Sequence, residues 1–160
     1  MVARMPGTRT PVDSAAAHLA VALPALHRAL DHRIRADFPH AGLPDGPLAL
    51  LRLAAEREGV TVREAAEALL MKPNNVSALV SQLTGRGLLE RRADPADRRV
   101  AHLYVTDLAR EHLAEARALA ERHLATAMRH LGEGEMAALG SALGALSSLT
   151  AHLRPAPGPA

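Results

Sequence analysis

Residues 61–105 read TVREAAEALLMKPNNVSALVSQLTGRGLLERRADPADRRVAHLYV, and this stretch decides the fold class. It opens with a capping box, because the Thr61 hydroxyl can accept from the Glu64 amide while the Glu64 carboxylate reaches back to Thr61. The helix that follows is short and ends at about Leu70. A second helix is predicted from about Pro73 to Gly85, since apolar residues recur at helical spacing along one face; they are Val76, Leu79, Val80 and Leu83.

The hydrophobic pattern changes from helical to strand-like after Gly87. Residues 88–92 and 99–105 can form two strands, and the segment between them contains Asp94-Pro95, which favours a turn. The two strands therefore form a hairpin with a polar, charged tip. Two short helices followed by such a hairpin predict a winged helix-turn-helix, in a fold that is mainly α with a small β component.

Helices are predicted on both sides of this stretch. Asp13 and Ser14 offer an N-cap for a first helix, which is expected to kink at Pro24. The segment 38–47 holds three prolines and two glycines and reads as a loop. A helix from about Pro47 to Glu58 follows this loop.

Two further helices are predicted after the hairpin. Thr106 or Asp107 caps a long helix to about residue 131, and Gly132 and Gly134 are expected to break it before a last apolar helix. Residues 1–11 and 154–160 are expected to be a disordered arm and a flexible tail.

Composition excludes several classes of protein. The chain has 160 residues and no cysteine, so disulfides and thiolate metal sites are excluded. We find no signal peptide and no run of 18 apolar residues, and we expect a cytoplasmic protein without a membrane span. Known catalytic fingerprints for nucleophiles, phosphates or dinucleotides are absent from the sequence, which predicts that the protein is not an enzyme.

The positive charge is concentrated in one segment. The formal net charge is only +2, but residues 72–99 carry six basic and three acidic side chains. A localised basic segment suits binding to phosphates. The alternative is that these arginines only decorate a solvated surface, and charge alone does not separate the two interpretations.

The stretch from Thr61 to Val105 resembles the MarR family, the multiple antibiotic resistance regulators. The resemblance rests on T-x-x-E-x-A at 61–66, P-x-x-V-S-x-L-V-x-x-L at 73–83, R-G-L-L-E-R-R at 86–92 and D-P-x-D-R-R at 94–99. The flanking helices match the family in number and order. The resemblance implies a sequence-specific regulator of transcription that binds duplex DNA, expected to be a repressor released by a small molecule, with no cofactor.

The resemblance also implies which residues contact DNA. The helix 73–85 would enter the major groove, and the hairpin would reach the adjacent phosphates or minor groove. Arg99 matches the minor-groove arginine of the family, Asp97 the acid that orients it, and Arg98 is expected at a phosphate. An alternative for Asp97 and Arg99 is a surface ion pair that stiffens the hairpin. The expected DNA-binding residues of the helix are Lys72, Asn74, Asn75, Ser77, Ala78, Ser81 and Gln82.

Several positions depart from the pattern of the family, among them Gly85 in the last turn of the helix 73–85 and Ala109, where the family often has glycine. Lys72 stands where a serine or threonine N-cap is usual, and Leu70 replaces a common turn glycine. Ala78 and Gln82 stand where basic residues are frequent. These departures predict an unusual affinity or operator preference.

The family pattern is a homodimer that binds a pseudo-palindromic operator. We expect residues 12–38 and 107–153 to form the dimerisation region and residues 46–106 the DNA-binding lobe. The periodicity alone also allows an intramolecular helical bundle. The residues expected at the dimer interface are Leu19, Leu23, Leu26, Leu30, Leu139, Leu143, Leu146 and Leu149.

An effector site and two other functions are weaker predictions. His27, His32, Phe38 and His112 are candidates to line an effector cleft, although histidines on apolar faces are more often packing residues. No H-x-x-x-H pair occurs, so no metal site is predicted, and a metal-responsive regulator stays an alternative. A winged helix used only for contacts with proteins is the other alternative.

Overall fold

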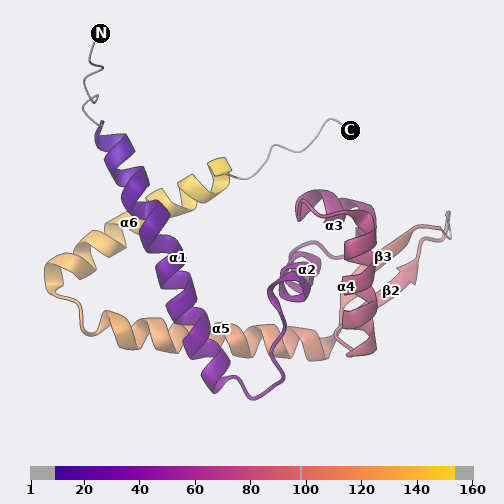
Figure 1. The fold of residues 1–160 in the computed structure, drawn as a ribbon. Helices are drawn as coiled ribbons and strands as arrows, with labels where there is room; N and C mark the ends of the chain where they lie inside the picture. Colours follow the sequence, from indigo (N-terminus) through magenta and orange to yellow (C-terminus); the bar gives the residue numbers. More distant parts are fainter. Residues whose placement is uncertain (1–9, 98, 154–160) are drawn as a thin grey trace, which may run out of the picture. The chain divides into compact units, whose positions relative to one another are not determined.

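The computed structural model describes residues 10–97 and 99–153, and these divide into two compact units. The first unit ends at Ala120 and the second begins at Glu121, within one continuous helix. Figure 1 shows the elements along the chain. They are α1 (Pro11–Asp37), α2 (Asp45–Glu56), β1 (Val60–Thr61), α3 (Val62–Ala68), α4 (Pro73–Gly85), β2 (Leu89–Ala93), β3 (Ala101–Val105), α5 (Asp107–Met128) and α6 (Glu133–Leu153). The mainly α fold with a small sheet is as predicted.

The beginning of α1 differs from the prediction. Thr10, and not Asp13 or Ser14, is the N-cap, and Asp13 is the third residue of a capping box. The Asp13 amide donates to the Thr10 hydroxyl over 3.1 Å, and the Thr10 amide donates to the Asp13 carboxylate over 3.0 Å. Pro11 is therefore part of the helix and not of an arm. Pro24 lies inside the helix, which continues to Asp37.

The hydrophobic core of the first unit lies among α2, α3, α4, the sheet and the beginning of α5. Fifteen buried residues form one cluster between Leu50 and Ala109, and none of them comes from α1. The fully buried side chains of α2 and α4 include Leu50, Leu51, Val76 and Val80. Burial of such side chains removes apolar surface from water and is the main stabilising term. The core thereby fixes α4 against the sheet (Figure 1).

The sheet has three strands in the order β1-β3-β2, all antiparallel. The sequence predicted the β2–β3 hairpin but not β1, which is only two residues long. β1 pairs with β3 through Val60 opposite Leu103 and Thr61 opposite His102. Gly59 precedes it with a φ of +79°, and a Cβ there would lie 3.1 Å from the Tyr104 hydroxyl. A glycine suits both constraints at this turn.

Other helix ends differ from the prediction by a few residues. α2 begins at Asp45 rather than Pro47 and ends at Glu56 rather than Glu58. α5 ends at Met128, earlier than residue 131. Gly134 lies within α6 and does not break a helix, because the Gly132 amide is capped by the Glu135 carboxylate over 2.8 Å. Capping, rather than glycine content, decides where α6 begins.

The second unit contains the end of α5 and all of α6. α6 has no buried residue in the single chain, and Leu143 and Leu153 are 58% and 76% exposed. It is the one helix of the described ranges long and apolar enough to cross a membrane, with a mean hydropathy of 1.3 over its most apolar window. This finding concerns length and composition alone, and the expectation that no segment spans a membrane stays a prediction. Interface helices of soluble proteins are also apolar, so this test does not distinguish a membrane from a partner chain.

Candidate nucleic-acid interface

The helix α4 has one face in the core and one face in solvent. Val76, Val80 and Leu83 are buried, and they hold the helix against α2, α3 and the sheet. The predicted DNA-contacting residues of this helix are all exposed, and they project from the opposite face: Asn74, Asn75, Ser77, Ala78, Ser81 and Gln82. The amides of Asn74, Asn75 and Gln82 can donate and accept hydrogen bonds, as bidentate contacts to adenine require.

The turn before α4 carries two of the departures from the family pattern, Leu70 and Lys72. Lys72 is the N-cap residue in an extended conformation, but no side-chain hydrogen bond caps the helix. Leu70 has a φ of +52° and is 88% exposed. A left-handed conformation is strained for leucine because its Cβ approaches the following carbonyl. The helix therefore begins without two devices that would stabilise its start.

The wing tip between β2 and β3 is organised by two carboxylates. The Asp94 Oδ1 atom accepts from the amides of Ala96 and Asp97 over 2.7 and 3.0 Å. The Asp97 Oδ1 atom accepts from the Arg99 amide over 2.9 Å. Asp97 thus positions the backbone of Arg99, whose side chain is exposed. Within the described ranges, the Arg99 guanidinium forms no ion pair with the Asp97 carboxylate. Arg98, also predicted at a phosphate, lies outside the described residues.

The basic residues of segment 72–99 do not share one role. The Arg86 guanidinium donates to the Ala41 carbonyl over 2.8 Å. The Arg92 guanidinium pairs with Glu90 at 3.0 Å and stacks over the Tyr104 ring at 4.4 Å. These two arginines therefore stabilise the fold. Lys72, Arg91 and Arg99 are exposed, and the described residues form no ion pair with them.

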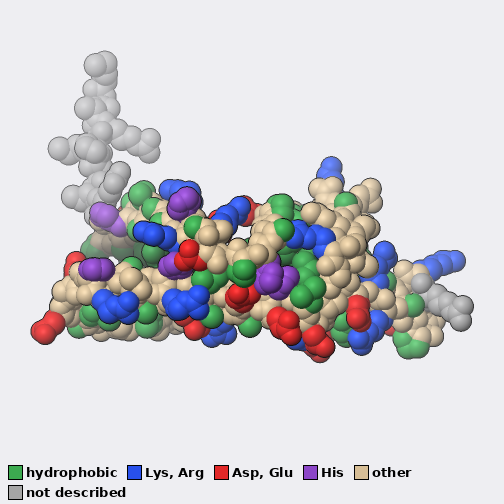
Figure 2. All heavy atoms as spheres, turned by 90° about the horizontal axis from the view of Figure 1, so that it is seen from below, with side chains coloured by type: hydrophobic (Ala, Val, Ile, Leu, Met, Phe, Trp, Pro, Cys, Tyr) green, Lys and Arg blue, Asp and Glu red, His purple; other side chains and the backbone are tan. Residues whose placement is uncertain are grey.

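Figure 2 shows Lys and Arg side chains at the hairpin end of the molecule. Lys72 precedes α4, and Arg91 and Arg99 belong to the hairpin, so the exposed cations flank the polar face of α4. Cations that flank a helix of this kind suit a duplex, because phosphates border the groove that the helix enters. The arrangement can bind duplex DNA through phosphates and base edges together.

A histidine connects the wing to the rest of the sheet. His102 on β3 places Nδ1 2.7 Å from the Gly59 carbonyl and Nε2 2.9 Å from the Asp94 carboxylate. These hydrogen bonds raise the pKa of His102, with the Asp94 contact as the largest cause. The His102 contact, followed by the two turn amides, lowers the pKa of Asp94. Sequence reasoning missed this pair because only the strand register brings the two residues together.

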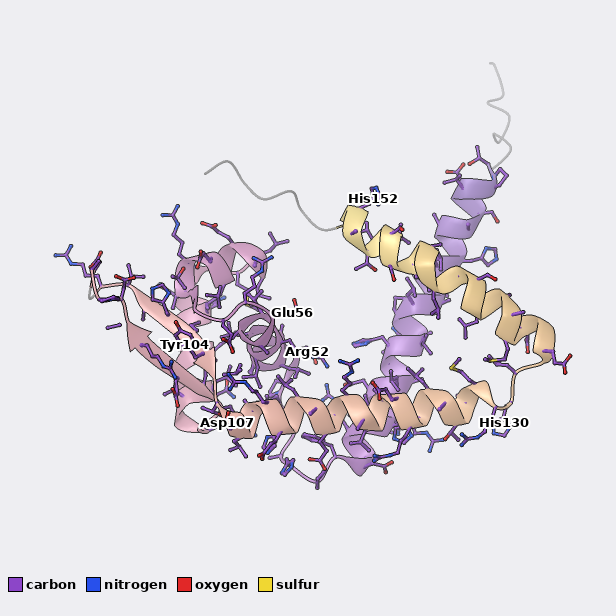
Figure 3. All side chains as sticks on the ribbon, turned by 180° about the vertical axis from the view of Figure 1, so that it is seen from behind. Arg52, Glu56, Tyr104, Asp107, His130 and His152 are labelled. Carbon is purple, nitrogen blue, oxygen red and sulfur yellow. The ribbon has the colours of Figure 1, made fainter. Side chains whose placement is uncertain are left out.

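A separate cleft of about 800 Å³ lies in the first unit, away from the polar face of α4. α1, the loop before α2, α2 and the first half of α5 form its walls. Its apolar lining includes Leu30, Ile34 and Leu113, and its charged lining includes Arg52 and Glu56 of α2 (Figure 3).

Three of the four predicted effector residues line this cleft. His27, Phe38 and His112 do, whereas His32 is exposed on α1 and does not. The sequence missed His40, whose ring stacks on that of His112 with the centroids 3.8 Å apart. His40 Nε2 lies 2.9 Å from the Glu115 carboxylate. Burial, followed by the neighbouring His40, lowers the pKa of His112, which favours its neutral form.

The described ranges contain no group of three or more His, Asp or Glu side chains that could hold a metal ion. The histidines of the cleft are polar groups in a mainly apolar lining. A cavity of this size, mainly apolar with a few polar groups, is typical of small-molecule sites.

Comparisons with known proteins agree on the class of fold. The sequence model described as the MarR family matches residues 41–100, which include α2, β1, α3, α4, β2 and the turn of the wing. A search for relatives among curated proteins finds no match.

Solved structures resemble nearly the whole chain. A protein assigned as a transcriptional regulator in Pseudomonas aeruginosa is 31% identical, with a TM-score of 0.72 over 89% of this chain and 97% of that one. A MarR family protein from Bacillus stearothermophilus has 18% identity and a TM-score of 0.69, over 87% and 97%. Streptococcus pneumoniae FabT, solved in complex with DNA, has 17% identity and a TM-score of 0.65, over 86% and 99%. The last two likenesses concern the fold alone.

Proposed function

The chain belongs to the MarR family of DNA-binding transcriptional regulators, which are not enzymes, and we propose that it is a cytoplasmic homodimeric repressor released by a small molecule. The observation that carries the proposal is the polar, exposed face of α4 flanked by the cations of the wing and of the preceding turn. FabT, which has a similar fold and was solved in complex with DNA, supports DNA binding as the proposed function.

In the proposed complex α4 enters the major groove. A major groove about 12 Å wide admits an α-helix, and the side chains from Asn74 to Gln82 then lie at base edges. Asn75 is near the N-terminal end of α4, where recognition helices usually read bases. Lys72 and Arg99 would bind phosphates or the minor groove on either side.

The proposed homodimer follows from two helices whose apolar residues are exposed in the single chain. α1 and α6 contain no buried residue. On α1, for example, the apolar residues Val21 and Leu26 are 73% and 55% exposed. Apolar residues exposed along two whole helices favour association. The occupant we propose is a second copy, with residues 12–38 and 107–153 as the dimerisation region. Two-fold symmetry then places two copies of α4 about one helical turn of DNA apart.

The dimer is tested by sedimentation of the purified chain and of Leu143→Glu, which places a charge on the exposed apolar side of α6. We expect the unmodified protein to sediment as a dimer and the variant as a folded monomer. A monomeric unmodified protein with full DNA affinity would refute the dimer.

The cleft of the first unit is the proposed effector site. Its mainly apolar lining with three histidines favours a small molecule that has an apolar body and a polar group. Because α1 and α5 form its walls together with α2, a ligand there contacts elements of the core lobe and of the proposed dimerisation region at once. A ligand that binds one relative placement of these elements better than another shifts the DNA affinity.

The cleft is tested with Ala116→Trp, which fills it from α5, and with the matched control Ala114→Trp on the exposed side of the same helix. The probe is the fluorescent dye 1-anilinonaphthalene-8-sulfonate. We expect it to bind the unmodified protein and the control, and to bind Ala116→Trp much less. Equal binding to the two variants would place the dye elsewhere and refute the cleft.

DNA binding is tested by fluorescence anisotropy with the duplex upstream of the protein's own gene and with a scrambled duplex. Selective binding that weakens steeply with salt is the expected result, because phosphate contacts release counterions. No binding at low salt would refute the function and favour a winged helix that contacts proteins. Repression is tested by transcription from the same duplex with and without the protein.

A further inference from the structure

His102 has hydrogen-bond acceptors on both of its ring nitrogens. Nδ1 lies 2.7 Å from the Gly59 carbonyl and Nε2 lies 2.9 Å from the Asp94 carboxylate. A carbonyl oxygen and an ionised carboxylate can only accept, so both ring nitrogens must donate. A neutral imidazole has one N–H and satisfies only one of these contacts. The geometry therefore fits the imidazolium.

The two contacts join parts of the lobe that are distant in sequence. Gly59 precedes β1, whereas Asp94 begins the wing turn. The other Asp94 oxygen accepts from the Ala96 and Asp97 amides, so one carboxylate holds both the turn and the imidazolium. Asp97 in turn accepts from the Arg99 amide. A continuous set of hydrogen bonds therefore runs from β1 through His102 to the backbone of Arg99.

We propose that protonated His102 is a positioning residue for DNA binding: it clamps the wing turn to β1 and so holds the Arg99 segment in the geometry that contacts the duplex. The proposal rests on the proposed function, because it assigns the wing a contact with DNA. His102 itself acts through Asp94 and need not touch the duplex.

The groups around His102 favour its charged form on balance. Asp94 lies at the wing turn, and Glu64, at the beginning of α3, also raises the pKa of His102. Arg92 stands opposite His102 in the β2–β3 register, but its charge is paired with Glu90. Thr61, opposite on β1, is neutral and donates to Glu64. Arg57, at the end of α2, acts on Glu64.

The direction of the pH dependence follows from these neighbours. Because the pKa of His102 is raised, the clamp is complete below its ordinary value and is lost as the pH rises through the raised value. Because the pKa of Asp94 is lowered, the carboxylate is charged at and above the ordinary aspartate pKa and loses its charge only as the pH falls through the lowered value. The clamp therefore operates between these two limits. The side chains of His102 and Asp94 are 29% and 28% exposed, so solvent reaches the pair and the effect is moderate.

The first measurement is an NMR titration of the histidine ring signals of the full chain without DNA. The His102 signal, identified by its absence in His102→Gln, should titrate above the ordinary histidine range, and Asp94→Asn should lower its pKa. The amide signals of Ala96 and Asp97 should shift with the same midpoint. A His102 with an ordinary pKa, or turn amides that do not follow it, would overturn the clamp whether or not the protein binds DNA.

The second measurement is DNA affinity at constant salt across the range in which histidine titrates, about pH 5 to 8 and slightly above. We expect the affinity of the unmodified protein to fall about threefold to tenfold as His102 loses its proton, as loss of a partly exposed, charge-assisted hydrogen bond implies. His102→Gln should have a flat profile at the weaker level. The control His130→Gln changes an exposed histidine of the second unit and should keep the original profile.

The two proposals fail in different ways. If DNA is bound and His102→Gln keeps the pH profile of the unmodified protein, the clamp is refuted and the regulator stands. If no duplex is bound at any pH, the regulator is refuted, and the NMR titration still decides the clamp. Asp94→Asn keeps an oxygen that can hold the turn amides, so it tests the clamp even if His102→Gln does not fold.

Discussion

Replacing Lys72 by serine should stabilise the protein and weaken its binding to DNA at the same time. Lys72 is the N-cap of α4, with φ −72° and ψ 141°, and its side chain caps nothing. Its carbonyl already accepts from the Asn75 and Val76 amides over 2.9 and 3.2 Å. The backbone is thus already in the conformation that a serine N-cap needs, and Pro73 supplies no amide that must be satisfied.

The two effects have separate magnitudes. A side-chain N-cap contributes about 1 kcal/mol, which corresponds to a rise of about 2–4 °C in Tm for a chain of this size. Loss of one phosphate contact reduces the magnitude of the slope of log K against log salt by about 0.9, so a dimer with both copies substituted should lose about 1.8. Lys72 is exposed and has no ion pair within the described ranges, so its removal costs little stability.

The assay is urea unfolding at fixed protein concentration together with anisotropy at several salt concentrations. Lys72→Ala is the matched control, because it removes the charge and adds no cap. Both variants should lose the same salt slope, and only Lys72→Ser should gain stability. If the two variants are equally stable, serine at position 72 does not cap α4. If the salt slope is unchanged, Lys72 does not contact a phosphate.

Asn75→Ala should change the ranking of operator variants in a competition assay, because Asn75 is placed to read a base; an identical ranking would contradict this role. Arg99→Ala should lower the affinity for operator and scrambled duplexes alike by about tenfold or more, and an unchanged affinity would remove the wing from the interface. Leu70→Asn should raise the free energy of unfolding by about 0.5–1 kcal/mol in urea melts, since asparagine tolerates a positive φ better than leucine and the side chain is exposed. The Thr61 amide and hydroxyl lower the pKa of Glu64, so its stabilising effect is present above the ordinary pKa of glutamate and is lost as the pH falls through the lowered value. In the same urea melts, the free energy of unfolding of Glu64→Gln should lose this part of its pH dependence. If the pH dependence of the variant equals that of the unmodified protein, the Glu64–Thr61 contact does not contribute to it.

The sequence predicted the elements that depend on neighbours along the chain. The Thr61–Glu64 capping box forms as expected, with the Thr61 amide 2.8 Å from the carboxylate. α4 has the predicted bounds, and the uncapped Lys72 was visible in the sequence. These features need only three to four consecutive residues, so local hydrogen bonding and helical spacing specify them.

Prediction from the sequence was less accurate where several neighbouring residues could each begin or end a helix. Thr10, Asp13 and Ser14 are all good N-caps, and Thr10 is used because Asp13 then completes a capping box. Gly134 suggested a break, but a glycine is tolerated inside a helix whose start is capped by Glu135. The family resemblance, rather than periodicity, supplied the expected roles of Asn75 and Arg99, and these roles stay predictions.

Only the tertiary structure decided the arrangement of residues that lie far apart in the sequence. β1 is too short to have a sequence signal, and it exists because β3 offers an edge for it. The stacked His40 and His112 come from a loop and from α5, 72 positions apart. Gly59, Asp94 and His102 meet only because the register of β3 fixes both of its neighbours. Strand register and helix packing depend on burial of the whole core, a cooperative property that no short segment contains, whereas caps and turns form from bonds within the segment itself.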